Sequence, residues 1–192
     1  MEQADDWEDV LGTGSVMKQV LVRGSRGTED LDMEAPRKFF ALIDIETRCN
    51  DELVESDSHR NYLINVDADL FPGAHLVIPL MDIGETSRYI FDAKFGYGEL
   101  GNPPDIPAQA KLECVITLKL RSSYDDFLEG MSPHERIQLA HRKKDRGKFW
   151  FARSNYQNAI SIYKSLADLC QSSDTEQLSK GSETGPVWLS FV

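Results

Sequence analysis

Residues 110–120 read AKLECVITLKL, and this stretch decides the fold. One face carries Leu112, Cys114, Ile116, Leu118 and Leu120, and the other carries Lys111, Glu113, Val115, Thr117 and Lys119. Because successive side chains of a strand point to opposite faces, the pattern predicts a strand with one buried and one exposed side. A half-buried strand is typical of an antiparallel sheet.

Further strands are expected on the N-terminal side of this stretch. Residues 16–22 are apolar enough for an edge strand, and residues 38–45 and 62–66 are denser apolar runs. Residues 46–60 are polar and are expected to form a long surface loop. A short helix is expected over residues 72–80, because its opening proline is tolerated in a first helical turn.

The apolar period changes after Leu120, where two helices are expected. Ser132, Pro133 and Glu135 supply a capping side chain, a first-turn proline and an acidic residue at the third helical position. Helical spacing then continues through residues 133–153 and again through residues 156–169. The sequence therefore predicts an α+β fold in which a sheet is followed by a helical hairpin.

The composition excludes several classes of function. The 192 residues carry a formal net charge of −11, so their electrostatic field repels nucleic acids and anionic membranes. Cys49, Cys114 and Cys170 are widely spaced, which fits a reducing compartment and neither a zinc site nor a disulfide framework. No run of about 18 apolar residues occurs, so no membrane span is expected. No metal or cofactor is expected either.

Three short motifs precede the 112–118 strand in a characteristic order. They are residues 80–85 (LMDIGE), 94–98 (KFGYG) and 106–108 (IPA). In order and spacing they resemble the second half of an FK506-binding-protein (FKBP) domain. The resemblance implies a bent antiparallel β-sheet wrapped around a short helix, with a peptidyl-prolyl cis-trans isomerase type of site.

Within that family the chain is most similar to a divergent, tail-anchored member with tetratricopeptide (TPR) repeats, found in mitochondria and endoplasmic reticulum. The similarity lies in residues 7–12 (WEDVLG), 79–86 (PLMDIGET) and 135–140 (ERIQLA). No anchor is expected in this chain, and the cytoplasm is the expected location. The domains implied are an acidic flexible tail over 1–15, an FKBP-type isomerase domain over 16–121, a TPR-like hairpin over 132–170 and a flexible tail over 171–192.

The resembled site holds a proline ring against aromatic side chains while a hydroxyl fixes a neighbouring carbonyl. Leu70, Phe71, Tyr97 and Ile106 match positions of that pocket. Tyr97 would supply the hydroxyl and would be the catalytic residue of an active domain. Leu70, Phe71 and Ile106 fit an ordinary core role equally well.

The pocket departs from the family at its most aromatic positions. The tryptophan floor, a Phe-Asp pair of the wall and the last-strand aromatic fall on Ala74, Val54, Glu55 and Cys114. An early-strand tyrosine aligns near Asp44 or Ile45. An aromatic floor buries roughly 150–250 Å², so its loss predicts weak or absent basal isomerase activity. The alternative is an active isomerase that assists protein folding; both readings imply binding of proline-containing client peptides.

The helical region has features of one TPR repeat, in which small residues let two helices approach and aromatic residues fill the gaps. These residues are Gly147, Phe151, Tyr156, Ala159 and Tyr163. TPR arrays of the resembled family bind the Hsp90 and Hsp70 chaperones, so the resemblance implies these partners. The function expected from the whole chain is that of an FKBP-type co-chaperone or adaptor.

The first of the two helices is basic in an otherwise acidic protein. Candidate partner-binding residues are Arg142, Lys143, Lys144 and Lys148. A basic amphipathic helix is a common type of calmodulin target, and the resembled member is linked to calmodulin. The alternative is a solvated helix face, or an internal partner for the acidic N-terminal tail.

Overall fold

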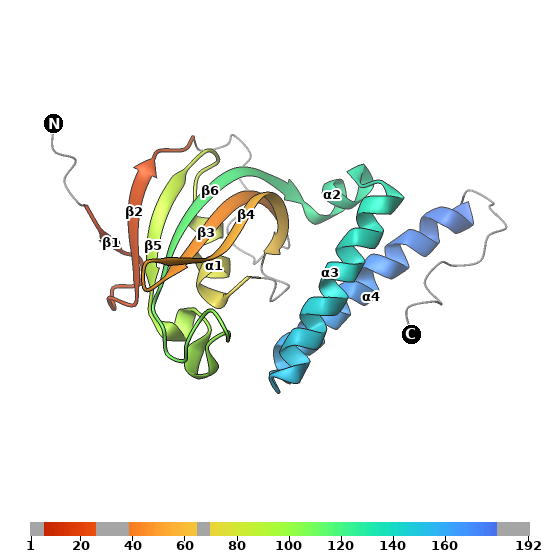
Figure 1. The fold of residues 1–192 in the computed structure, drawn as a ribbon. Coiled ribbons are helices and arrows are strands. Elements are labelled where there is room, and N and C mark those ends of the chain that lie inside the picture. The colour runs from red at the N-terminus through yellow and green to blue at the C-terminus, as the bar shows by residue number, and fades with distance from the viewer. Residues whose placement is uncertain (1–5, 26–38, 65–69, 180–192) are drawn as a thin grey trace. The chain divides into compact units, whose positions relative to one another are not determined.

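The computed structural model describes residues 6–25, 39–64 and 70–179. Its strands form one antiparallel sheet with the spatial order β1-β2-β5-β6-β3-β4 (Figure 1). The strands are β1 (Glu8–Asp9), β2 (Val16–Val22), β3 (Phe39–Cys49), β4 (Glu52–Ile64), β5 (Thr86–Phe91) and β6 (Leu112–Ser123). The expected α+β fold with an antiparallel sheet is confirmed.

The short helix predicted over residues 72–80 is also confirmed. Helix α1 spans Pro72–Val77 and continues as the 3-10 turn η1, Ile78–Leu80. Pro72 occupies the first helical position, where its missing N–H removes no intrahelical hydrogen bond. The helix buries Gly73, Ala74 and Val77 in the core that it shares with the inner face of the sheet.

The long surface loop predicted over residues 46–60 is wrong. Strand β3 runs to Cys49 and β4 begins at Glu52, so the two pair as a long hairpin. Asn50 and Asp51 make the turn with φ angles of 51° and 67°. Asn and Asp tolerate this left-handed conformation, which a tight two-residue turn between twisted strands requires. Of the polar residues mistaken for a loop, Glu46, Arg48 and Ser56 lie on the outer face of these strands, whereas Thr47 and Glu55 lie on the inner face.

Two strands lie where none was predicted. Strand β5 follows the motif at residues 80–85 and pairs with both β2 and β6. Strand β1 lies inside the segment predicted to be a flexible tail over residues 1–15, and it covers part of the outer edge of β2. The Asp9 carboxylate accepts hydrogen bonds from the N–H groups of Leu11 (3.2 Å) and Gly14 (2.6 Å) and so fixes the turn between β1 and β2.

Helix α2 (Tyr124–Gly130) follows the sheet and precedes the hairpin formed by α3 (Pro133–Ala152) and α4 (Tyr156–Ser179). At the start of α3 the predicted capping box is present, because Ser132 and Glu135 satisfy each other's backbone N–H groups. Helix α4 ends ten residues after the predicted Leu169. Residues 171–179 are therefore helical, contrary to the predicted tail; residues 180–192 lie outside the described part.

The chain forms two compact units that divide after Asp126. The first contains the sheet and α1, and the second contains α3 and α4. In the second unit, Trp150, Ala159 and Ile162 form a small buried core between α3 and α4. Within residues 6–25, 39–64 and 70–179, no helix is long and apolar enough to cross a membrane.

Candidate functional site

A row of directly opposed residues crosses the whole sheet on its inner face. In spatial order from β1 to β4 the row consists of Glu8, Lys18, Tyr89, Cys114, Thr47 and Glu55. Directly opposed residues of an antiparallel pair place their side chains on the same face. All six side chains carry a polar or sulfur atom. We call these six residues the central row.

In the middle of the central row, a hydroxyl and a thiol form a fully buried contact. Thr47 Oγ1 and Cys114 Sγ lie 3.1 Å apart, and both side chains have no exposed surface. Burial raises the pKa of the Cys114 thiol to about 12, although the hydrogen bond to Thr47 opposes the shift. The nearby Glu55 carboxylate raises it further. Cys114 is therefore a neutral thiol at physiological pH and is unsuited to act as a nucleophile.

Four aromatic rings form a column beside this contact. Tyr89 and Phe91 stack with ring centroids 5.7 Å apart, Phe71 meets Phe91 edge-on at 5.2 Å, and Tyr97 lies 6.0 Å from Phe71. The column runs from the sheet through the N-terminal end of α1 to the loop after β5. A Cβ atom added at Gly73 would lie 2.5 Å from the Phe91 ring, so only glycine allows this approach.

The structure brings the predicted pocket residues of the sheet unit together. Leu70, Phe71, Ala74, Ile106 and Cys114 are buried in one core cluster. Of the rest, Val54 and Tyr97 are partly exposed and pack against that cluster. Glu55 is partly exposed as well, next to Val54 on β4. The predicted pocket therefore consists of a closed apolar interior and a rim that reaches solvent.

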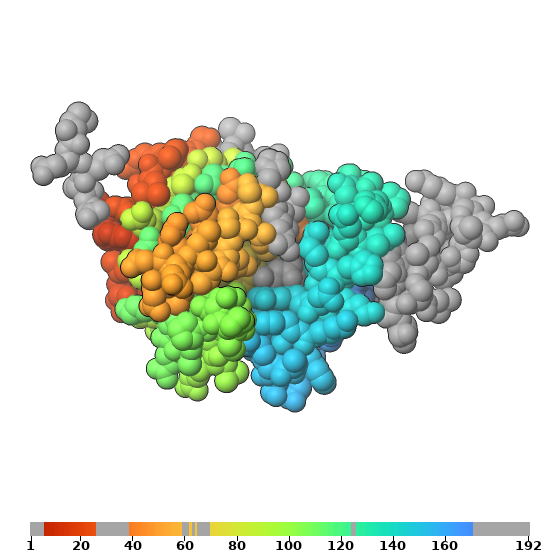
Figure 2. Space-filling model, in the orientation of Figure 1, coloured from red at the N-terminus to blue at the C-terminus, as the bar shows by residue number. Residues whose placement is uncertain are grey.

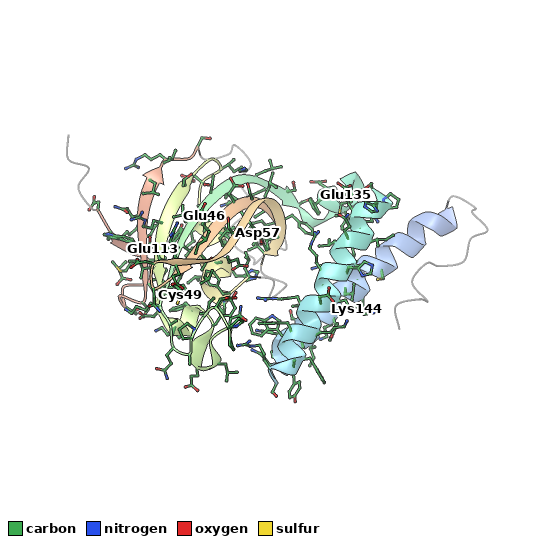
Figure 3. All side chains as sticks on the ribbon, in the orientation of Figure 1. Glu46, Cys49, Asp57, Glu113, Glu135 and Lys144 are labelled. Atoms are coloured by element: carbon green, nitrogen blue, oxygen red, sulfur yellow. The ribbon has the colours of Figure 1, made fainter. Side chains whose placement is uncertain are left out.

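Two segments supply the rim. Val54 and Glu55 come from the β3–β4 hairpin, and Tyr97 precedes the 3-10 turn η3 (Gly98–Leu100) in the loop between β5 and β6. In Figure 2 the hairpin surface, in orange, adjoins the surface of this loop, in green. Figure 3 shows Cys49 at the hairpin end and Asp57 further along β4. The rim is thus formed by segments about 40 residues apart in the sequence, which only the fold brings together.

The two residues near which the early-strand tyrosine is expected to align, Asp44 and Ile45, lie on opposite faces of β3. Asp44 forms an ion pair with Lys119 at 2.7 Å on the outer face, and Ile45 lies opposite Ile116. The residue opposite Cys114 is Thr47. Its position follows from the turn at residues 50–51, which sets the hairpin register, so a turn prediction there would have found it.

Phe91 and Tyr89 are a second omission of the sequence analysis. Both lie on β5, which was not predicted, and their side chains point into the core with Ser87. The alternating pattern of Ser87, Tyr89 and Phe91 against Arg88 and Ile90 was the available signal. Phe91 matters for the site because it packs against α1 beside Ala74, which stands where the resembled pocket has its aromatic floor.

The four predicted partner-binding residues lie on α3, in the helical unit. Arg142 and Lys148 are exposed and Lys144 is partly exposed (Figure 3). Lys143 is different: 1% of its surface is exposed, and burial lowers the pKa of its ammonium group to about 7. Lys143 therefore does not present a charge to a partner in this conformation, and the prediction for this residue is wrong.

Residues 33–119 match the family model described as FKBP-type peptidyl-prolyl cis-trans isomerase. The chain is 32% identical over 96 residues to FK506-binding protein 59 of Drosophila melanogaster, covering 49% of this chain and 21% of that protein. It is 24% identical over 166 residues to the mouse inactive peptidyl-prolyl cis-trans isomerase FKBP6, covering 81% of this chain and 50% of that protein. It spans a half or less of either relative.

A similar fold occurs in a solved structure that contains the three FKBP domains of wheat FKBP73. The TM-score is 0.50 at 22% sequence identity, and the match covers 62% of this chain and 49% of that one. The match to the family model contains strands β3 to β5, helix α1, Tyr97 and most of β6. The sheet unit of this protein is therefore an FKBP-type domain.

Proposed function

We propose that this FKBP-type domain binds proline-containing segments of client proteins as a co-chaperone or adaptor, with weak or absent basal isomerase activity. The observation that carries the proposal is the Thr47–Cys114 contact. It occupies the inner face where the resembled pocket has aromatic side chains. Cys114 stands where the resembled pocket has the aromatic side chain of its last strand, and a cysteine buries far less apolar surface than an aromatic ring, so a proline ring is held less tightly.

The chemistry of isomerisation explains why holding the ring matters. The barrier of about 18–20 kcal/mol comes from amide resonance, and an enzyme lowers it by binding the twisted amide more tightly than the planar one. Each loss of about 1.4 kcal/mol from that difference slows the reaction tenfold. A site with Ala74, Val54 and Cys114 at the aromatic positions retains few contacts that could distinguish the two states.

The alternative function, an active isomerase, is favoured by one observation. The ring centroids of Phe71 and Tyr97 lie 6.0 Å apart, so two aromatic residues matched to the resembled pocket lie next to each other. The similarity to mouse FKBP6, whose name records an inactive isomerase, favours the weakly active reading. The remaining question is therefore quantitative and can be answered by one pair of measurements.

Isomerase activity and peptide binding should be measured on the same preparation. A protease-coupled assay with a Leu-Pro peptide gives the rate, and an NMR titration with an uncleavable Leu-Pro peptide gives the affinity. We expect a rate more than tenfold below that of a single-domain FKBP, with binding shifts at the amides of residues 54, 55 and 97. Tyr97→Phe should weaken binding about three- to tenfold, the effect of one hydrogen bond. A rate within tenfold of the single-domain FKBP would establish the alternative function.

We also propose that the α3–α4 hairpin is a TPR-like repeat that works in the cytoplasm with chaperone or calmodulin partners. The support is the close contact of Gly147 with the Tyr163 ring, a small residue that admits an aromatic one. A pull-down with calcium-loaded calmodulin or with the C-terminal peptide of Hsp90 tests the partners. We expect each partner to capture the wild-type chain and to lose the Arg142→Glu, Lys144→Glu double variant. If a partner does not capture the wild-type chain, it is excluded.

A further inference from the structure

Four large apolar side chains of the helical unit are exposed together. Phe151 at the end of α3 has 61% of its surface exposed, and Tyr156, Ile160 and Tyr163 of α4 have 54%, 48% and 38% exposed. We call these four residues the aromatic stripe. An isolated exposed apolar residue is ordinary, whereas a contiguous apolar patch of several hundred Å² often has a function in binding.

The aromatic stripe is contiguous because of helix geometry. Tyr156, Ile160 and Tyr163 are spaced four and three residues apart, so they lie on one face of α4 and span about 10 Å along its axis. Phe151 joins them across the turn, with its ring centroid 5.5 Å from that of Tyr156. Tyr163 closes the other end, where its ring covers Gly147 of α3.

Other residues form the core between α3 and α4, although Tyr163 of the stripe also contacts Gly147 of α3. Trp150, Ala159 and Ile162 already form the core between α3 and α4, and they are at most 6% exposed. The stripe therefore leaves on the order of 400 Å² of apolar surface in water, the size of the largest patch on a typical monomer. Burying such an area against a partner removes apolar surface from water and so favours association.

The charges beside the stripe select an acidic partner. Between residues 133 and 170 the sequence has eight basic and three acidic residues, in a chain whose net charge is −11. Lys148 lies three residues before Phe151 and its side chain is 63% exposed. Lys164 is exposed and lies four residues after Ile160, on the adjacent turn of α4. Lysines thus flank the stripe on both helices.

We propose that the aromatic stripe is the docking surface for an amphipathic helix of a partner protein, with apolar residues at positions i, i+4 and i+7 and acidic residues on both sides of them. The stripe residues Tyr156, Ile160 and Tyr163 have the same spacing on α4, so the side chains of the two helices interdigitate. The lysines then face the acidic flanks, which speeds encounter and fixes the orientation of the partner. A second copy of this chain would bring lysines against lysines and is disfavoured.

A designed 18-residue peptide tests the proposal on the full chain. It carries Leu at the three spaced positions and Glu on the flanks, and its binding is followed by the anisotropy of an attached dye at 0.05 M and 0.3 M salt. A second peptide carries Lys in place of every Glu. We expect the acidic peptide to bind at least tenfold more tightly than the basic one, and the difference should shrink at the higher salt.

Three variants locate the binding surface. Ile160→Asp should weaken binding of the acidic peptide at least tenfold, and Lys148→Glu combined with Lys164→Glu should abolish the preference for the acidic peptide. Leu80→Asp is the control, because Leu80 is 51% exposed on the sheet unit and should leave binding unchanged. Circular dichroism confirms that each variant keeps its helices.

The proposal is overturned if both peptides bind alike, or if Ile160→Asp has no more effect than Leu80→Asp. It is also overturned if light scattering shows a dimer that Ile160→Asp converts to a monomer, because a second copy then occupies the stripe.

Discussion

Thr47 Oγ1 and Cys114 Sγ lie 3.1 Å apart at the centre of the sheet, on directly opposed residues of β3 and β6. The contact determines two properties of the FKBP-type domain. It places two small side chains together on the inner face of the sheet, and it buries a thiol whose pKa is raised to about 12. The first property concerns function; the second can be measured without any ligand.

Two of the three cysteines, Cys114 and Cys170, are expected to differ in their rate of alkylation. The Cys114 thiol is fully buried and protonated, whereas Cys170 on α4 is partly exposed. Since only the thiolate reacts, Cys114 should be modified by iodoacetamide at pH 8 at least a hundredfold more slowly than Cys170. Peptide mapping by mass spectrometry at several times gives both rates. Equal rates would mean that the sheet opens readily near Cys114.

Acid is expected to destabilise the sheet unit through Glu85. This buried carboxylate pairs with Lys18 at 2.9 Å, accepts a hydrogen bond from Ser87 at 2.6 Å and accepts another from the N–H of Asp82 at 2.9 Å. Burial alone would raise the pKa of Glu85, but the interactions with Ser87, Asp82 and Lys18 outweigh it and lower the pKa below 4.5. The group therefore stabilises the fold above its unfolded pKa, and this contribution is lost as the pH falls through the folded pKa.

Glu85→Gln tests this assignment. We expect a loss of about 2–4 kcal/mol at pH 7, because the variant leaves Lys18, whose side chain is only 14% exposed, without its carboxylate partner. The loss should be smaller at pH 3, because this pH lies below the ordinary pKa of a glutamate and part of the stabilising contribution of the carboxylate is already lost there. Urea unfolding at both pH values measures the difference, and Glu113→Gln, at an exposed pair with Arg88, is the control. A loss that is the same at both pH values would contradict the assignment.

Gly147→Ala should destabilise the helical unit although alanine favours helices. In an exposed helix the change gains up to about 1 kcal/mol. Here the added Cβ would lie 2.5 Å from the Tyr163 ring, and overpacking of this kind costs about 1–3 kcal/mol. Thermal unfolding followed by circular dichroism measures the net effect. In a Tyr163→Ala background the same change should be neutral or stabilising, and any other sign would exclude the contact as the cause.

Ala74→Trp is expected not to create an active isomerase. Ala74 has no exposed surface, and the adjacent Gly73 lies directly against Phe91, so α1 has no room for an indole. We expect a loss of about 1–3 kcal/mol or more in stability and no gain in the protease-coupled assay. Val54→Phe, at the partly exposed rim, should cost less. Faster isomerisation by Ala74→Trp at unchanged stability would reveal an open space above Ala74.

The sequence alone determined the elements that have a strong local signal. The alternation over residues 112–120 predicted β6, Pro72 predicted the start of α1, and the capping box at Ser132 predicted the start of α3. Each depends on neighbours a few residues apart, whose side-chain directions follow from backbone geometry. The motifs at residues 80–85 and 94–98 carried the family resemblance in the same local way.

Only the tertiary structure decided the site. The hairpin turn at Asn50 and Asp51 sets the register that places Thr47 against Cys114, 67 residues away in the sequence. Likewise, Phe91 became part of the site because β5 pairs between β2 and β6 and directs its ring toward Gly73. Local patterns state which way a side chain points along its own element. Which side chain it meets depends on strand register and packing between distant segments, and these are set only when the chain folds.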